Sequence, residues 1–61
     1  MKYKVVFEFK WFGADSDGLW HCDSVDNNGK GFTKEEAERI AQEINGREWN
    51  RNAKMEVLYG D

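Results

Sequence analysis

Hydrophobic and polar residues alternate along positions 2–12, which read KYKVVFEFKWF. Such alternation, carried by β-branched and aromatic residues, is typical of a β-strand with one buried face. A cluster of turn-forming residues follows at 13–18, and positions 19–25, LWHCDSV, predict a second strand. The buried face of this second strand stays open, because Trp20 and Cys22 fall on one side and three further residues fall on the other. Those three residues are Leu19, His21 and Val25.

A helix over about 34–45 is the most clearly predicted element. Thr33 and Glu36 have the spacing of a capping box, in which each side chain bonds the backbone amide of the other residue. Phe32 and Ala37 stand where a hydrophobic staple would place them. The apolar stripe recurs at helical spacing and consists of Ala37, Ile40, Ala41 and Ile44.

Asn45-Gly46 supplies a stop for the helix, and the polar segment 47–52 reads as a connection. Alternation then returns and predicts a third strand at about 53–59. We therefore predict one domain over 1–61, of the α+β class, with the element order β-β-α-β. The third strand should pair antiparallel beside the first, giving a three-stranded sheet of order 2-1-3, because pairing beside the second strand would need a parallel edge. The single helix should pack its apolar stripe on the aromatic face of this sheet, which carries Tyr3, Val5, Phe7, Phe9 and Trp11.

The net charge of the chain and the length of its apolar runs exclude some classes of function. Twelve acidic residues against nine basic residues give a net charge of -3, with the basic residues dispersed along the chain. Nonspecific nucleic-acid binding relies on an excess of Lys and Arg, so we expect no direct contact with DNA or RNA. No apolar run approaches the roughly 20 residues of a membrane span, and no signal-peptide core follows the first residues. We therefore expect a cytoplasmic protein without membrane contact.

The sequence offers little catalytic machinery, and we expect no enzyme, no catalytic residue and no cofactor. His21 and Cys22 are neighbours, but successive strand residues point to opposite faces, so the thiol and imidazole cannot pair. We expect Cys22 to be a small buried hydrophobic residue and His21 to be solvated. As the only cysteine, Cys22 also excludes an internal disulfide.

The glycine-rich loop 26–31, DNNGKG, carries an alternative function, that of a small regulatory or metal-binding module. With Glu35, it matches the second half of a calcium-loop pattern, D-x-N-G-x5-E. Ser24 stands where that pattern needs an acid, and calcium takes about six oxygen ligands. A glycine-rich turn leading into a capped helix is the simpler interpretation, and we predict no metal ligands.

Aromatic residues are the compositional anomaly, because nine of them outnumber the eight Leu, Ile and Val residues. Small cores use large side chains to gain buried area, which is one interpretation. The other is that some aromatic residues are exposed anchors among charged residues, as in protein-interface hot spots. The clustered acids are either a solvated surface or a face presented to a basic groove. The predicted partner-binding residues are Asp15, Asp17, Trp20, Asp23, Asp26, Glu35, Glu38 and Trp49.

An aromatic hairpin, the segment DNNGKGFTKEEAERIAQEIN and a closing strand ending in VLYGD follow one another here. This arrangement resembles short orphan proteins encoded by phages and other mobile elements. Such proteins include inhibitors of host defence, among them anti-CRISPR proteins that occupy a nuclease or DNA-binding surface, sometimes as DNA mimics. The nine basic residues depart from the strongest DNA mimics.

The resemblance implies a non-enzymatic inhibitor that docks an acidic and aromatic surface on a larger host protein, such as a nucleic-acid-binding defence complex. It would act in the host cytoplasm. A sheet with one helix also leaves one face uncovered, and such patches are normally buried against something. We therefore expect a homodimer or a heteromeric contact through this sheet face or its edge, with a monomer as the alternative.

Overall fold

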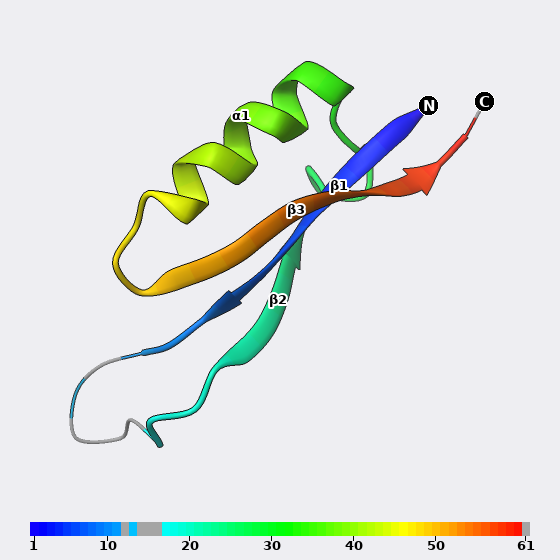
Figure 1. The fold of residues 1–61 in the computed structure, drawn as a ribbon. Coiled ribbons are helices and arrows are strands. Elements are labelled where there is room, and N and C mark those ends of the chain that lie inside the picture. The colour runs from blue at the N-terminus through cyan, green and yellow to red at the C-terminus, as the bar shows by residue number, and fades with distance from the viewer. Residues whose placement is uncertain (12, 14–16, 61) are drawn as a thin grey trace.

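The computed structural model describes residues 1–11, 13 and 17–60. Three antiparallel strands form a sheet in the order β2-β1-β3, and one helix lies along one face of it (Figure 1). This confirms the predicted α+β fold and strand order. The elements are β1 (Lys2–Phe9), β2 (His21–Val25), α1 (Lys34–Asn45) and β3 (Asn50–Tyr59).

The ladder of the first hairpin is shorter than its alternation pattern predicts. β1 ends at Phe9 rather than at position 12, which lies outside the described residues, and β2 begins at His21 rather than at position 19. The Leu19 N–H donates to the Asp17 carboxylate at 2.9 Å instead of joining a ladder. A local side-chain acceptor therefore replaces strand pairing at this end of the hairpin.

β3 begins three residues before its predicted start at position 53. Arg51 pairs with Glu8 and Lys54 pairs with Val6, so one residue of β1 faces two residues of β3. Asn52, at this β-bulge, has a positive φ of 56°. Polar residues and a bulge both interrupt the two-residue period, which is why periodicity marked this part of the strand as a connection.

α1 begins and ends where the sequence predicts. The Glu36 N–H donates to Thr33 Oγ1 at 3.2 Å, and the Thr33 N–H donates to Glu36 Oε1 at 2.9 Å, which confirms the capping box. Accepting the Thr33 backbone N–H is the main cause that holds the pKa of Glu36 below its ordinary value. The helix ends at Asn45, and the N–H of Gly46 bonds carbonyl oxygens of the last turn.

The loop before α1 returns to the sheet. Tyr3 and Phe32 exchange two backbone hydrogen bonds, of 2.8 and 2.9 Å, beyond the end of β2. Gly31 precedes this bridge with a φ of 78°, and a Cβ atom there would lie 2.6 Å from the Cβ of Lys2. Glycine is therefore required at this position for both its backbone freedom and its lack of a side chain.

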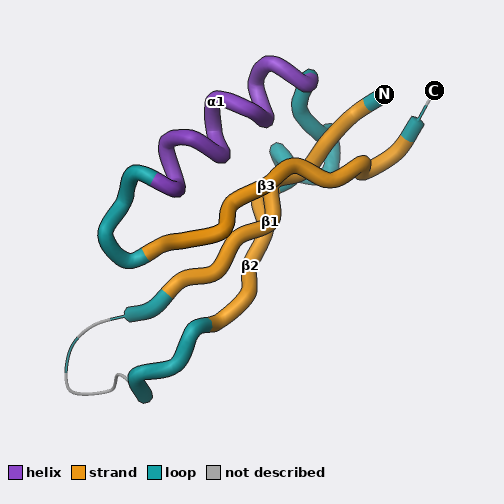
Figure 2. Tube along the Cα trace, in the orientation of Figure 1, coloured by secondary structure: helices purple, strands orange, loops and turns teal. Residues whose placement is uncertain are grey.

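The buried core is small and lies between α1 and the strands β1 and β3. Its buried residues are Val5, Ala37 and Ile44, with Phe7, Phe32 and other partly buried residues packed around them. Among the described residues, α1 contacts β1 and β3 but not β2, which is the edge strand farther from the helix (Figures 1 and 2). The radius of gyration is 12.6 Å, against about 10.5 Å for a compact chain of this length. The hairpin thus extends past its covering helix.

Candidate functional site

Four aromatic rings form a row along the hairpin, and we call them the aromatic strip. Alternation places Phe7, Phe9 and Trp11 on the helix side of the sheet, and pairing of Phe9 with His21 adds the imidazole. Successive ring centroids along the first three residues are 6.3 and 5.6 Å apart. The His21 ring stacks on Trp11 at 4.1 Å with an interplanar angle of 11°. Trp11 nevertheless keeps 42% of its surface exposed.

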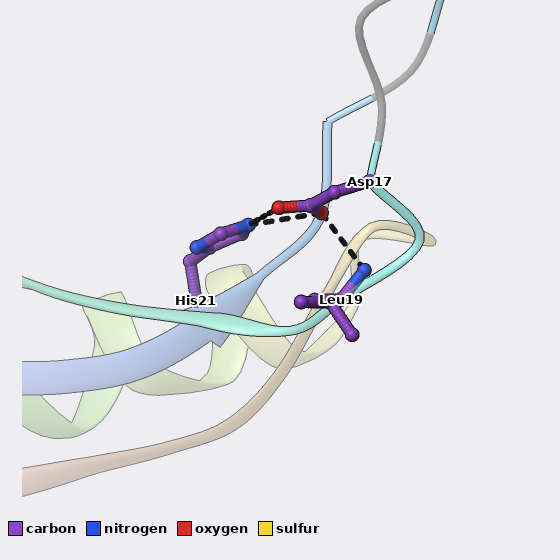
Figure 3. A network of polar contacts seen from close by, with 3 residues as sticks. All are labelled: Asp17, Leu19 and His21. Atoms are coloured by element: carbon purple, nitrogen blue, oxygen red, sulfur yellow. Dashed lines mark hydrogen bonds and ion pairs between the residues drawn. The ribbon is translucent and has the colours of Figure 1, made fainter.

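A carboxylate holds the imidazole of the strip in place. Figure 3 shows the His21 ring pointing at Asp17, whose two oxygens lie 3.0 and 3.1 Å from Nε2. The same carboxylate accepts the Leu19 N–H, and this bond, followed by the one to His21, lowers the pKa of Asp17. His21 is therefore a fixed, half-buried member of the strip, and the prediction that it is simply solvated is wrong.

The strip continues into an apolar groove between α1 and β2. This groove of about 410 Å³ exists because α1 does not contact β2 among the described residues. Its lining combines apolar side chains of β1, β2 and α1 with charged residues of both signs. The apolar residues include Phe7, Phe9, Val25 and Ile40, and the charged residues are Asp23, Glu43, Lys10 and Arg47.

Both edge strands of the sheet carry side-chain caps. In β2, the Ser24 N–H donates to the Asp23 carboxylate at 2.7 Å. In β3, the Asn45 side chain accepts the Ala53 N–H at 2.8 Å and donates to the Ala53 carbonyl at 3.1 Å. Backbone groups that already have partners are poor templates for another strand. The homodimer stays a prediction, and these caps favour a contact through a face of the sheet over one through an edge.

The structure scatters the predicted acidic site residues. Asp17 belongs to the strip and Asp23 lines the groove, whereas Asp26 caps a turn near the other end of β2, where its carboxylate accepts the Gly29 N–H at 3.1 Å. Glu35 and Glu38 are exposed on α1. Position 15, the remaining predicted acid, lies outside the described residues. A continuous acidic face therefore does not form from the described members of this set.

The two predicted tryptophans are not among the four rings of the strip. Trp20 has the Arg51 guanidinium 4.0 Å and the Lys10 ammonium 4.8 Å from its ring, so cations flank it rather than acids. Trp49 follows α1 and is 43% exposed. Cys22 is exposed, so the prediction that it is buried is wrong; its register opposite Glu8 places it on the face away from α1.

The glycine-rich loop 26–31, on which the alternative metal-binding hypothesis rests, is held by hydrogen bonds between its own residues. Its Gly31 N–H donates to the Asp26 carbonyl at 2.8 Å, and the Asn27 side chain donates to the Gly31 carbonyl at 3.2 Å. Within residues 1–11, 13 and 17–60, no group of three His, Cys, Asp or Glu side chains could hold a metal ion. The oxygens of this loop thus serve the turn that leads into α1.

Sequence reasoning missed the strip as a site. Alternation did place Phe7, Phe9 and Trp11 on one face, but that face was expected to lie under the helix.

No family model, curated protein or solved structure matches the chain. The described residues contain no helix with the length and hydrophobicity that a membrane span requires.

Proposed function

We propose that this chain is a non-enzymatic binding protein, an inhibitor of the phage type, that docks its aromatic strip on a larger host protein. The observation that carries the proposal is the exposed Trp11 at the end of the aromatic strip, which runs into the apolar groove. Tryptophan and tyrosine are enriched in interface hot spots because they bury large areas at low entropic cost. The Asp17–His21 bond fixes the row before binding, which lowers the entropy lost on association.

The groove indicates the chemistry of the partner. Apolar lining from Phe9, Val25 and Ile40 fits an apolar side chain of the partner. The charged lining, which is Asp23, Glu43, Lys10 and Arg47, fits a partner surface that carries both basic and acidic groups. Defence complexes that bind nucleic acid offer basic groups for the two carboxylates. An interface of standard size buries about 800 Å² on each partner, about a fifth of the 4445 Å² surface of this chain.

The proposal is tested in bacterial strains that each carry one nuclease-based defence system. The chain is expressed in each strain, and the plating efficiency of a restricted phage is measured. The wild-type chain should raise plating in at least one strain, and Trp11→Ala should abolish the effect because it removes the exposed end of the strip. Trp49→Ala is the matched control, since Trp49 is as exposed as Trp11 but follows α1 and is not one of the four rings of the strip.

Two results would count against the proposal. Failure of the wild-type chain to raise plating in every strain would remove the inhibitor function. Equal loss in the two tryptophan variants, or loss only in Trp49→Ala, would remove the strip as the docking surface. Circular dichroism of both purified variants checks that each keeps its fold.

A further inference from the structure

The face of the sheet away from α1, which we call the open face, has a charge opposite to that of the whole chain. Strand pairing places Lys4 opposite Glu56 and Lys54 opposite Val6 on this face. Its described residues include four cations and two carboxylates, although the chain as a whole has twelve acidic and nine basic residues. The open face includes Lys4, Val6, Glu8, Lys10, Trp20, Cys22, Ser24, Arg51, Asn52, Lys54 and Glu56.

Topology gathers these cations from distant parts of the sequence. Lys10 follows β1 and Arg51 belongs to β3, yet both lie against the ring of Trp20. The guanidinium of Arg51 also bonds Glu8, with 3.1 Å between Nε and Oε1. Among the described residues, no carboxylate lies within ion-pair distance of the other three cations of the open face. The net charge of -3, which argues against nucleic-acid binding by the whole chain, therefore does not describe the open face.

A groove of about 580 Å³ lies beside this cluster. Its lining combines an apolar floor that includes Val6 and Cys22 with the polar side chains of Lys54, Asn52 and Glu8, whose carboxylate is bonded by Arg51 and Asn52. Asn52 reaches the groove from the β-bulge, and its amide donates to Glu8 at 2.6 Å. Lys4 lies in β1 and Lys10 follows that strand, and six residues of extended chain between them span about 20 Å.

We propose that the open face binds single-stranded nucleic acid, with lysines on the phosphates and a base on the apolar floor of the groove. Single strands alternate charged phosphates with flat apolar bases, and proteins bind them with basic grooves and apolar or aromatic platforms. An acidic peptide offers the charge but not the flat groups that this floor fits. The strip lies on the other side of the sheet, so this site goes beyond the proposed docking function and is tested separately.

The test is fluorescence anisotropy with a labelled oligothymidine of about 12 nucleotides, long enough to span the lysines. Lys4, Lys10 and Lys54 give three phosphate contacts, so log K should fall with log salt at a slope of about -2. Raising the salt from about 20 mM to about 200 mM should weaken binding about 100-fold. Lys10→Glu/Lys54→Glu should weaken binding at low salt by at least about 10-fold.

Lys30→Glu/Lys34→Glu is the matched control, because it changes the net charge equally on residues outside the open face. This control should stay within about threefold of the wild type. Absence of binding at low salt, equal weakening by both double variants, or equally tight binding of polyglutamate would overturn the proposal. If the Lys10/Lys54 variant does not keep the circular dichroism spectrum of the wild type, Lys54→Gln is measured instead. Its plot of log K against log salt should be less steep than that of the wild type by about 0.7, and an unchanged slope refutes the site.

Discussion

Asn45 ties the end of α1 to the bulged part of β3, and Asn45→Ala should remove this tie. The side chain makes two hydrogen bonds to the Ala53 backbone, of 2.8 and 3.1 Å. Each such bond contributes about 1 kcal/mol net, while alanine gains about 0.5 kcal/mol over asparagine as a helix former. The free energy of unfolding should therefore fall by about 1.5 kcal/mol. Chains of this length have about 3–9 kcal/mol in total, so the loss is large.

Thermal unfolding followed by circular dichroism measures this loss. For a small domain, 1 kcal/mol shifts the melting temperature by about 4–8 °C, so Asn45→Ala should melt about 6–12 °C below the wild type. Gln42→Ala, at an exposed position of the same helix, is the control and should melt at or slightly above the wild-type temperature. If Asn45→Ala melts together with Gln42→Ala, the side-chain cap on β3 does not stabilise the fold and the reasoning fails.

Three further predictions concern stability. In urea, Thr33→Ala should lose about 1 kcal/mol because a helix N–H loses its acceptor, and an unchanged midpoint would contradict the capping box. Gly31→Ala should lose more than Gly29→Ala, because both add strain of about 1–2 kcal/mol at a positive φ but only the first adds a steric overlap. The pKa of Asp17 is lowered in the fold, so its stabilisation holds above its ordinary pKa and is lost as the pH falls through the folded value. The melting temperature should thus fall in acid, and less steeply in Asp17→Asn; equal slopes would refute this contribution.

Local patterns in the sequence were enough to predict the main elements. The helix needed only Thr33, Glu36 and an apolar stripe, all within a few turns of one another. Strand order followed from strand direction, because placing the third strand beside the second would need a parallel edge. These predictions succeeded because each rests on residues that are close in sequence.

Features that depend on long-range pairing could not be predicted. The imidazole of His21 joins the aromatic strip only because β2 pairs with β1 in one particular register. Lys10 and Arg51 read as dispersed basic residues, and only the sheet brings them to the same tryptophan. The early start of β3 was hidden by polar residues and by the bulge at Asn52.

The central claim is that the aromatic strip is the surface that a partner covers. Site-specific photo-crosslinking tests it most directly, with p-benzoylphenylalanine in place of Trp11 or, as the control, in place of Trp49, in a strain where the chain restores plating. We predict an adduct with one subunit of the defence complex from position 11 and none from position 49. Excess wild-type chain should suppress this adduct, and excess Phe9→Ala should not. Adducts of equal yield from both positions, or from position 49 alone, would contradict the account.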